Sequence, residues 1–227
     1  MPFEDLPNRL AEVRQRIDRA LSRGGHGQAV RIIAVTKTHG PDAVQAAWDA
    51  GLQDVGENRV QEALGKMAAV SPPVRWHLIG HLQRNKVKSA DGFQLIHSID
   101  SQRLAATVDE HARAKGKRQP VLIQVNVVGE ESKGGFSLTE LKTAASTLAG
   151  MQGIDVRGVM TMAPLDAPED ILRRVFTGAR DARTVLVDSG FTECRELSMG
   201  MSGDYEVAIE EGATMIRLGT VLFGGRA

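Results

Sequence analysis

The sequence has 227 residues, of which 42% are hydrophobic, enough for the core of one large α/β domain or two small ones. Lys plus Arg and Asp plus Glu each number 28, and this zero net charge argues against nucleic acid or an anionic membrane as the main partner. The single cysteine, Cys194, excludes an intrachain disulfide. We see neither a secretory signal nor an apolar run near the roughly 18 residues of a membrane span, and therefore expect a cytoplasmic protein.

The first expected element is an amphipathic helix. Apolar residues recur at spacings of three and four from Phe3 to Leu21, which is the pattern of a helix with one buried face. Gly24 and Gly25 follow, and glycine commonly stands just beyond the last turn of a helix. We therefore predict that the helix ends at this pair.

After this helix, short β-branched runs alternate with polar, Ala-rich stretches that indicate helices. Several of the expected strands are almost wholly apolar, which is typical of a parallel sheet buried on both faces. The predicted strands are 31–36, 52–56, 75–79, 94–98, 120–127, 155–160, 194–198 and 214–218. The predicted helices between them are 41–50, 59–69, 82–90, 101–115, 138–149, 168–187 and 203–211.

Eight strands alternating with helices predict a (β/α)₈ barrel, the TIM barrel of the α/β class, in a single domain over 1–227. Seven residues follow Thr220, too few for a full eighth helix, so we expect the N-terminal helix to pack over the last strand instead. An open doubly wound sheet is the alternative, but no G-x-G-x-x-G motif follows the first strand.

Functional groups gather where the predicted strands end, which is where barrels of this kind place their active sites. Lys37 follows the first strand, and a primary amine at a barrel mouth can form a Schiff base with an aldehyde or ketone. The loops after strands seven and eight contain glycines and hydroxyls suited to binding a phosphate through backbone N–H groups and side chains. These residues are Ser198, Gly200, Ser202, Gly219 and Thr220.

Three histidines on or beside the predicted strands raise the question of a metal site. For His77, His81 and His97, no carboxylate or cysteine stands at a spacing that would complete a ligand set. We therefore predict no metal. His81, near the barrel mouth, is a candidate contact for a bound ligand.

Six distinctive blocks of sequence lie along almost the entire chain, at 34–37, 56–62, 76–86, 197–204, 216–220 and 223–224. They resemble the pyridoxal phosphate homeostasis proteins, vitamin B6-binding proteins related to the barrel domain of alanine racemase. Their joint occurrence is highly specific.

The resemblance implies a fold-type III barrel that holds pyridoxal 5′-phosphate (PLP) as an internal aldimine on Lys37. By the same resemblance, Ser198, Gly219 and Thr220 would bind the phosphate. Arg217 would face the pyridine nitrogen. The residues expected to contact PLP are Lys37, Asn58, Ser198, Met199, Arg217, Gly219 and Thr220.

The resemblance further implies a carrier that releases PLP to apo-enzymes without catalytic turnover. We expect a monomer, because the dimer of the racemases depends on their additional domain. An arginine facing the pyridine nitrogen stays protonated and cannot give that nitrogen a proton, which makes the ring a weaker electron sink. Racemases of this fold take a second acid/base group from an additional β-domain, and this sequence ends soon after the eighth strand. Two alternatives stay open: an amino-acid racemase or lyase that uses the Lys37 aldimine, and a Schiff-base aldolase acting on a phosphorylated sugar.

Overall fold

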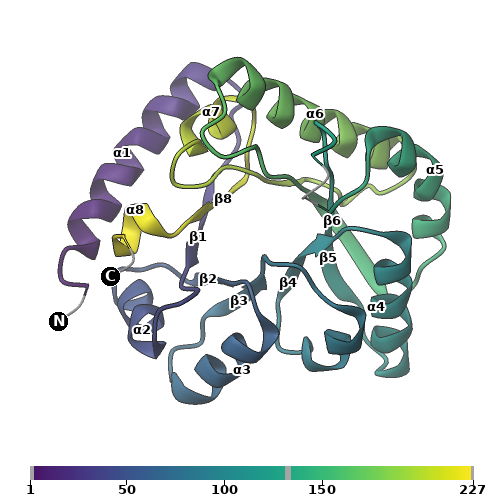
Figure 1. The fold of residues 1–227 in the computed structure, drawn as a ribbon, viewed down its shortest axis with the longest axis horizontal. Helices are drawn as coiled ribbons and strands as arrows, with labels where there is room; N and C mark the ends of the chain where they lie inside the picture. The colour runs from purple at the N-terminus through teal and green to yellow at the C-terminus, as the bar shows by residue number, and fades with distance from the viewer. Residues whose placement is uncertain (1–2, 131–133, 226–227) are drawn as a thin grey trace.

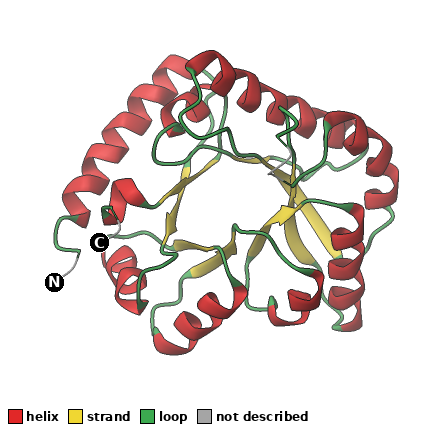
Figure 2. Ribbon diagram, in the orientation of Figure 1, coloured by secondary structure: helices red, strands yellow, loops and turns green. Residues whose placement is uncertain are grey.

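Eight parallel strands close into a barrel in the order β1 to β8, with helices around the outside (Figures 1 and 2). This computed structural model describes residues 3–130 and 134–225. The strands are β1 (Arg31–Val35), β2 (Asp54–Glu57), β3 (Arg75–Leu78), β4 (Leu95–Ile99), β5 (Gln119–Gln124), β6 (Ile154–Met160), β7 (Glu196–Ser198) and β8 (Met215–Leu218). The helices are α1 (Leu6–Gly24), α2 (Pro41–Asp49), α3 (Val60–Ala69), η1 (Arg84–Ser89), α4 (Gln102–Ala114), α5 (Leu138–Ala149), α6 (Glu169–Asp188), α7 (Tyr205–Glu210) and α8 (Thr220–Phe223).

The predicted barrel is confirmed, and every predicted strand is present with small shifts at its ends. One helix differs from expectation. The segment predicted as a helix over 82–90 forms the 3₁₀ helix η1, in which Val87 is the buried residue. A single apolar contact gives no stripe along which a longer α-helix could pack, so the tighter turn suffices. In the described parts of the chain, no helix is long and apolar enough to span a membrane.

Helix α1 packs over the last part of the barrel, as predicted. It runs alongside α7 and α8 (Figure 1) and buries one face, made of Leu6, Leu10, Val13, Ile17 and Ala20. Gly25 ends the helix in the left-handed conformation, with φ of 67°. Helix α8 is a single short turn, so α1 supplies the cover that a full eighth helix would provide.

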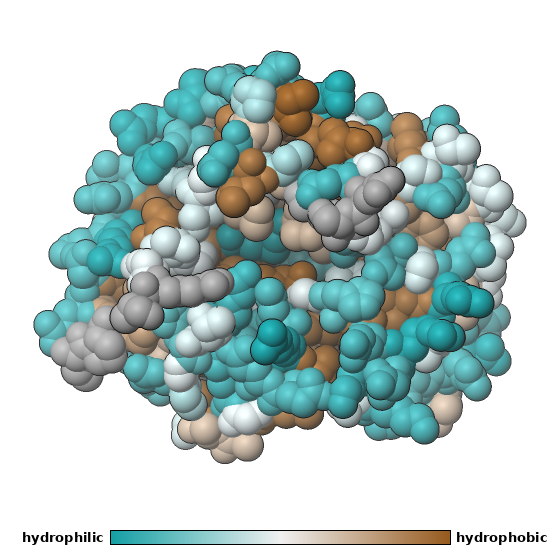
Figure 3. Space-filling model, viewed as in Figure 1, coloured by the Kyte–Doolittle hydropathy of each residue, from teal (hydrophilic) through white to brown (hydrophobic). Residues whose placement is uncertain are grey.

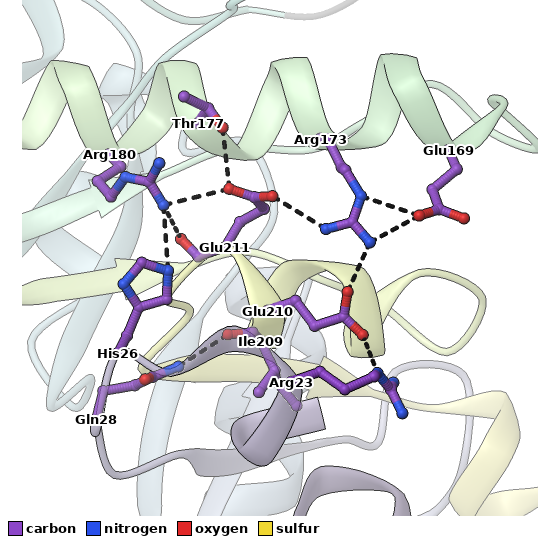
Figure 4. A network of polar contacts seen from close by, with 10 residues as sticks. All are labelled: Arg23, His26, Gln28, Glu169, Arg173, Thr177, Arg180, Ile209, Glu210 and Glu211. Carbon is purple, nitrogen blue, oxygen red and sulfur yellow. Dashed lines mark hydrogen bonds and ion pairs between the residues drawn. The ribbon is translucent and has the colours of Figure 1, made fainter. Parts of the chain in front are cut away.

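A network of ion pairs joins α1, α6 and α7 on the outer surface (Figure 4). Arg173 of α6 contacts Glu210 at 2.6 Å and Glu211 at 3.1 Å, while Arg23 of α1 contacts Glu210 from the other side at 2.5 Å. Arg180 also reaches Glu211, at 3.2 Å. Exposed pairs contribute about 0–1 kcal/mol each, but here shared carboxylates couple three helices.

The apolar core lies mainly between the barrel and its helices. A second, smaller apolar cluster fills part of the barrel interior. Its buried members are Ile33, Leu95, Leu122, Met160 and Met215. Because this cluster is small, the rest of the interior is available to polar side chains.

Gly158 of β6 marks a close approach of two strands. A Cβ at this position would lie 2.0 Å from the carbonyl oxygen of Glu196 on β7, and backbone cannot yield as a flexible side chain would. We expect Gly158→Ala to lower the free energy of unfolding by about 3 kcal/mol, the upper end of the usual range for overpacking. Chemical denaturation would measure this loss, provided that the m-value is the same in the variant and the wild type.

Gly65 of α3 provides the matched control, because a Cβ there meets nothing within 4 Å. We expect Gly65→Ala to stabilise the protein by about 0.5–1 kcal/mol through reduced backbone entropy. Equal stabilities for the two variants would contradict the close-approach interpretation.

Candidate functional site

A cavity of about 680 Å³ lies among the loops that follow the strands at their carboxyl ends. Figure 3 looks onto this end of the barrel, where polar and apolar surface meet in a central hollow. Five of the seven residues expected to contact PLP line the cavity: Lys37, Asn58, Arg217, Gly219 and Thr220.

The pairing of β1 with β8 brings the amine and the glycine turn together. Ala34 pairs with Leu218, so that Lys37 and Gly219 both follow the same edge of the barrel. The backbone at Gly219 approaches β1 closely, because a Cβ there would stand 3.4 Å from the carbonyl oxygen of Val35. Thr220 begins α8, and the first turn of a helix leaves backbone N–H groups without intrahelical acceptors.

Arg217 is a buried cation in the wall of this cavity. Its Nη1 donates to Ser198 Oγ at 2.8 Å, and its Nη2 donates to the carbonyl oxygen of Thr161 at 2.9 Å. Burial lowers the pKa of the guanidinium to about 10, an effect that nearby Asp204 opposes, so the group stays charged at neutral pH. A guanidinium has five N–H donors, so others are left for an acceptor inside the cavity.

Ser198 and Met199, the other two expected contacts, are not among the described residues that line the cavity. Both are fully buried. Ser198 Oγ bonds to His97 Nδ1 at 2.8 Å as well as to Arg217. Ser202 lines the cavity instead, and its Oγ accepts the N–H of Val221 at 3.3 Å. A phosphate contact from Ser198 or Met199 therefore stays a prediction.

A chain of buried hydrogen bonds continues from Ser198 through the barrel interior. His97 Nε2 lies 2.9 Å from His77 Nδ1, and His77 Nε2 lies 2.9 Å from Asp54 Oδ1. Arg75 donates to both oxygens of Asp54, at 2.8 and 2.6 Å. Burial alone would raise the pKa of Asp54, but the bonds from Arg75 and His77 outweigh it and hold that pKa well below its usual range.

The protons of this chain can be assigned by requiring that each has an acceptor. Burial lowers the pKa of His97 well below its usual value, and the nearby cation Arg217 lowers it further, so its ring is neutral. Ser198 accepts from Arg217 and then donates to His97 Nδ1. His97 therefore carries its proton on Nε2 and donates it to His77 Nδ1, which leaves the His77 proton on Nε2 facing the Asp54 carboxylate.

His81 also has a carboxylate partner. Its Nδ1 lies 2.9 Å from Asp100 Oδ2, and both residues line the cavity. Asp54 and Asp100 reach these histidines from neighbouring strands or strand ends, and spacing along the chain does not reveal such pairs. Within residues 3–130 and 134–225, no group of three or more His, Cys, Asp and Glu side chains could hold a metal ion.

The proton assignment can be tested on the protein without ligand. We expect ¹H–¹⁵N NMR of the imidazoles to show His77 and His97 as neutral Nε2–H tautomers near pH 7, because only this arrangement gives every proton an acceptor. Ser198→Ala should remove the donor to His97 Nδ1 and shift that nitrogen's resonance, with His111 on α4 as an unaffected reference. A doubly protonated ring or an Nδ1–H tautomer at either position would contradict the assignment.

Comparison with known proteins places the chain among its relatives. Residues 9–227 match the family model of the alanine racemase N-terminal domain. The pyridoxal phosphate homeostasis protein of Aquifex aeolicus is 43% identical over 222 residues, covering 96% of this chain and 97% of the relative. The protein of the same name from Escherichia coli K12 is 36% identical, covering 99% and 98%.

Solved structures agree with this placement. PipY of Synechococcus elongatus, whose structure has PLP bound, superposes with a TM-score of 0.86 at 36% identity and covers 96% of this chain and all of PipY. Alanine racemase of Clostridium difficile gives a TM-score of 0.76 at 13% identity over 93% of this chain and 57% of the racemase, a likeness of fold alone. The chain thus belongs to the alanine racemase N-terminal domain family and, within it, to the pyridoxal phosphate homeostasis proteins.

Proposed function

We propose that this chain binds PLP in the cavity at the barrel mouth, with Lys37 as its covalent partner and with Gly219 and Thr220 at its phosphate. The observation that carries the proposal is that these residues line one cavity together with the buried cation Arg217. PipY, at 36% identity over its whole length, has been solved with PLP bound, which supports the same ligand here.

The residues of the cavity fit the chemical groups of this ligand. Lys37 supplies a primary amine, which condenses with the aldehyde of PLP with loss of one water and is regenerated when water adds back. Arg217 offers N–H donors that Ser198 and Thr161 do not use, suited to an unprotonated ring nitrogen. The turn at Gly219, the hydroxyl of Thr220 and the hydroxyl of Ser202 suit a phosphate.

The biological role that we propose is PLP homeostasis, in which a monomer in the cytoplasm holds the reactive aldehyde and releases it to apo-enzymes. The names of relatives from Aquifex aeolicus and Escherichia coli support homeostasis as the role. Reversible condensation at Lys37 is the chemistry that such holding and release require.

Lys37 is the residue to test. We expect the purified protein with PLP to show a visible absorption band that borohydride abolishes, and peptide mapping to place the reduced label on Lys37. Lys37→Ala should lose the covalent band because no other lysine lines the cavity among the described residues, while weak binding through the phosphate loops survives.

The control for this experiment is Lys142→Ala, which removes an exposed lysine on α5. This variant should keep the band and the label at full yield. A label on another lysine in the wild-type protein, or an undiminished band in Lys37→Ala, would overturn the assignment.

A further inference from the structure

Lys66 of α3 is a buried lysine outside the cavity lining. Its side chain is 5% exposed, and its ammonium contacts Glu57 Oε1 at 2.6 Å and Glu62 Oε1 at 2.9 Å. Lysine is rarely buried unless it is paired, and a buried ion pair such as Lys66 with Glu57 is a costly way to stabilise a fold. We name Lys66, Glu57 and Glu62 the Lys66 cluster.

The Lys66 cluster holds both peptide groups that flank Lys37. Lys66 Nζ donates to the carbonyl oxygen of Thr36 at 2.8 Å, which belongs to the peptide unit before Lys37. Glu62 Oε1 accepts the N–H of Thr38 at 2.6 Å, which belongs to the peptide unit after Lys37. Two charged side chains of one cluster therefore fix the peptide planes on either side of the Lys37 Cα.

The backbone at Thr38 needs such a restraint. Its φ is 68°, in the left-handed region that a residue with a branched Cβ seldom adopts. A conformation of this kind costs roughly 1–3 kcal/mol and persists only where surrounding contacts enforce it. The charge-assisted bond to Glu62 is such a contact.

Glu57 anchors the cluster to β2 at a cost to stability. The residue is fully buried, and its Oε1 also accepts the Thr36 hydroxyl at 2.5 Å. Its second oxygen, Oε2, is buried with no hydrogen-bond partner among the described residues. A buried charge that is only half satisfied is better explained by a positional role than by a contribution to folding.

We propose that the Lys66 cluster positions Lys37, so that the geometry of Thr36 and Thr38 sets how well the Lys37 amine reaches an aldehyde in the cavity. This inference rests on the proposed function of Lys37 as the covalent partner of PLP. Lys66, Glu57 and Glu62 act through the backbone and are positioning residues, since none of them lines the cavity.

Glu62 is the best residue at which to test the proposal, because it is partly exposed and its loss leaves Lys66 paired with Glu57. We expect Glu62→Ala to slow formation of the borohydride-trapped adduct on Lys37 by about 10-fold or more, since small misplacements of a reacting group cost up to about 100-fold. Pyridoxine 5′-phosphate lacks the aldehyde and so cannot form the adduct. Its affinity should change by no more than about 2-fold, much less than the rate of adduct formation.

A second measurement does not depend on PLP. Hydrogen exchange of the Thr38 amide in the ligand-free protein should be slow in the wild type, fast in Glu62→Ala and slow again in Glu62→Gln, whose amide oxygen can still accept the bond. Glu110→Ala, which removes an exposed carboxylate from α4, is the control and should change neither measurement.

The two proposals fail in different ways. Absence of any wild-type adduct on Lys37 would overturn the proposed function, and the Thr38 exchange rates would then still report on the backbone restraint. If Glu62→Ala lowers adduct formation and pyridoxine 5′-phosphate affinity together, or leaves Thr38 exchange and adduct formation unchanged, the positioning role is wrong.

Discussion

The contact on which the site depends is the pairing of β8 with β1 that closes the barrel. The residues that meet there come from the two ends of the described chain, and no local interaction could bring them together. Because the strands are parallel, their carboxyl ends share one edge, so Lys37 and Gly219 emerge side by side from neighbouring strands. Helix α1 covers the same closure from outside, and the ion-pair network of Figure 4 joins α1 to α6 and α7 beside it. The N-terminal helix is thus part of what holds the site together.

Closure also places a charge in the barrel interior. The described contacts of Arg217 are with Ser198 and Thr161, which are neutral, although Asp204 is near enough to affect its pKa. The hydrogen-bonded chain of Ser198, His97 and His77 leads from this cation to the Asp54 carboxylate. Hydrogen-bonded neutral groups polarise one another, so they can stabilise the Arg217 cation and the Asp54 carboxylate at a distance. The positive charge of Arg217 at the cavity is then not cancelled. A carboxylate placed directly against Arg217 would satisfy the donors that a ligand needs.

The fold could be predicted from the sequence because its signals are local. Apolar runs indicated the eight strands, and a lysine and a glycine turn directly after strands marked the cavity. Contacts that depend on register could not be predicted in this way. Asp54 pairs with Arg75 in the β2–β3 register, and only this pairing reveals Asp54 as the partner of His77 one pleat along.

The direction in which a side chain points was the second feature that could not be predicted from the sequence. Ser198 ends β7, and a hydroxyl at a strand end can point to the mouth or into the barrel; the structure directs it toward His97 and Arg217. Lys66 was hidden for another reason. With Glu62 four residues before it, the pair has the spacing of an ordinary exposed ion pair on a helix, and only the packing of α3 against the barrel shows that the lysine is buried.

Lys37 directly follows β1, which lies between β8 and β2 in the barrel. On one side of β1 lies β8, which supplies Arg217 and the Gly219 turn; on the other lies β2, which supplies Glu57 and leads into α3 with its Lys66. On the β2 side, the Lys66 cluster contacts the peptide groups next to Lys37. On the β8 side, the cavity wall offers the N–H donors of Arg217 to a ligand. The contacts that restrain the backbone at Lys37 and the donors that face a ligand therefore come from different strands. A nucleophile arranged in this way can be held in place through its peptide groups while its side chain remains the part that reacts.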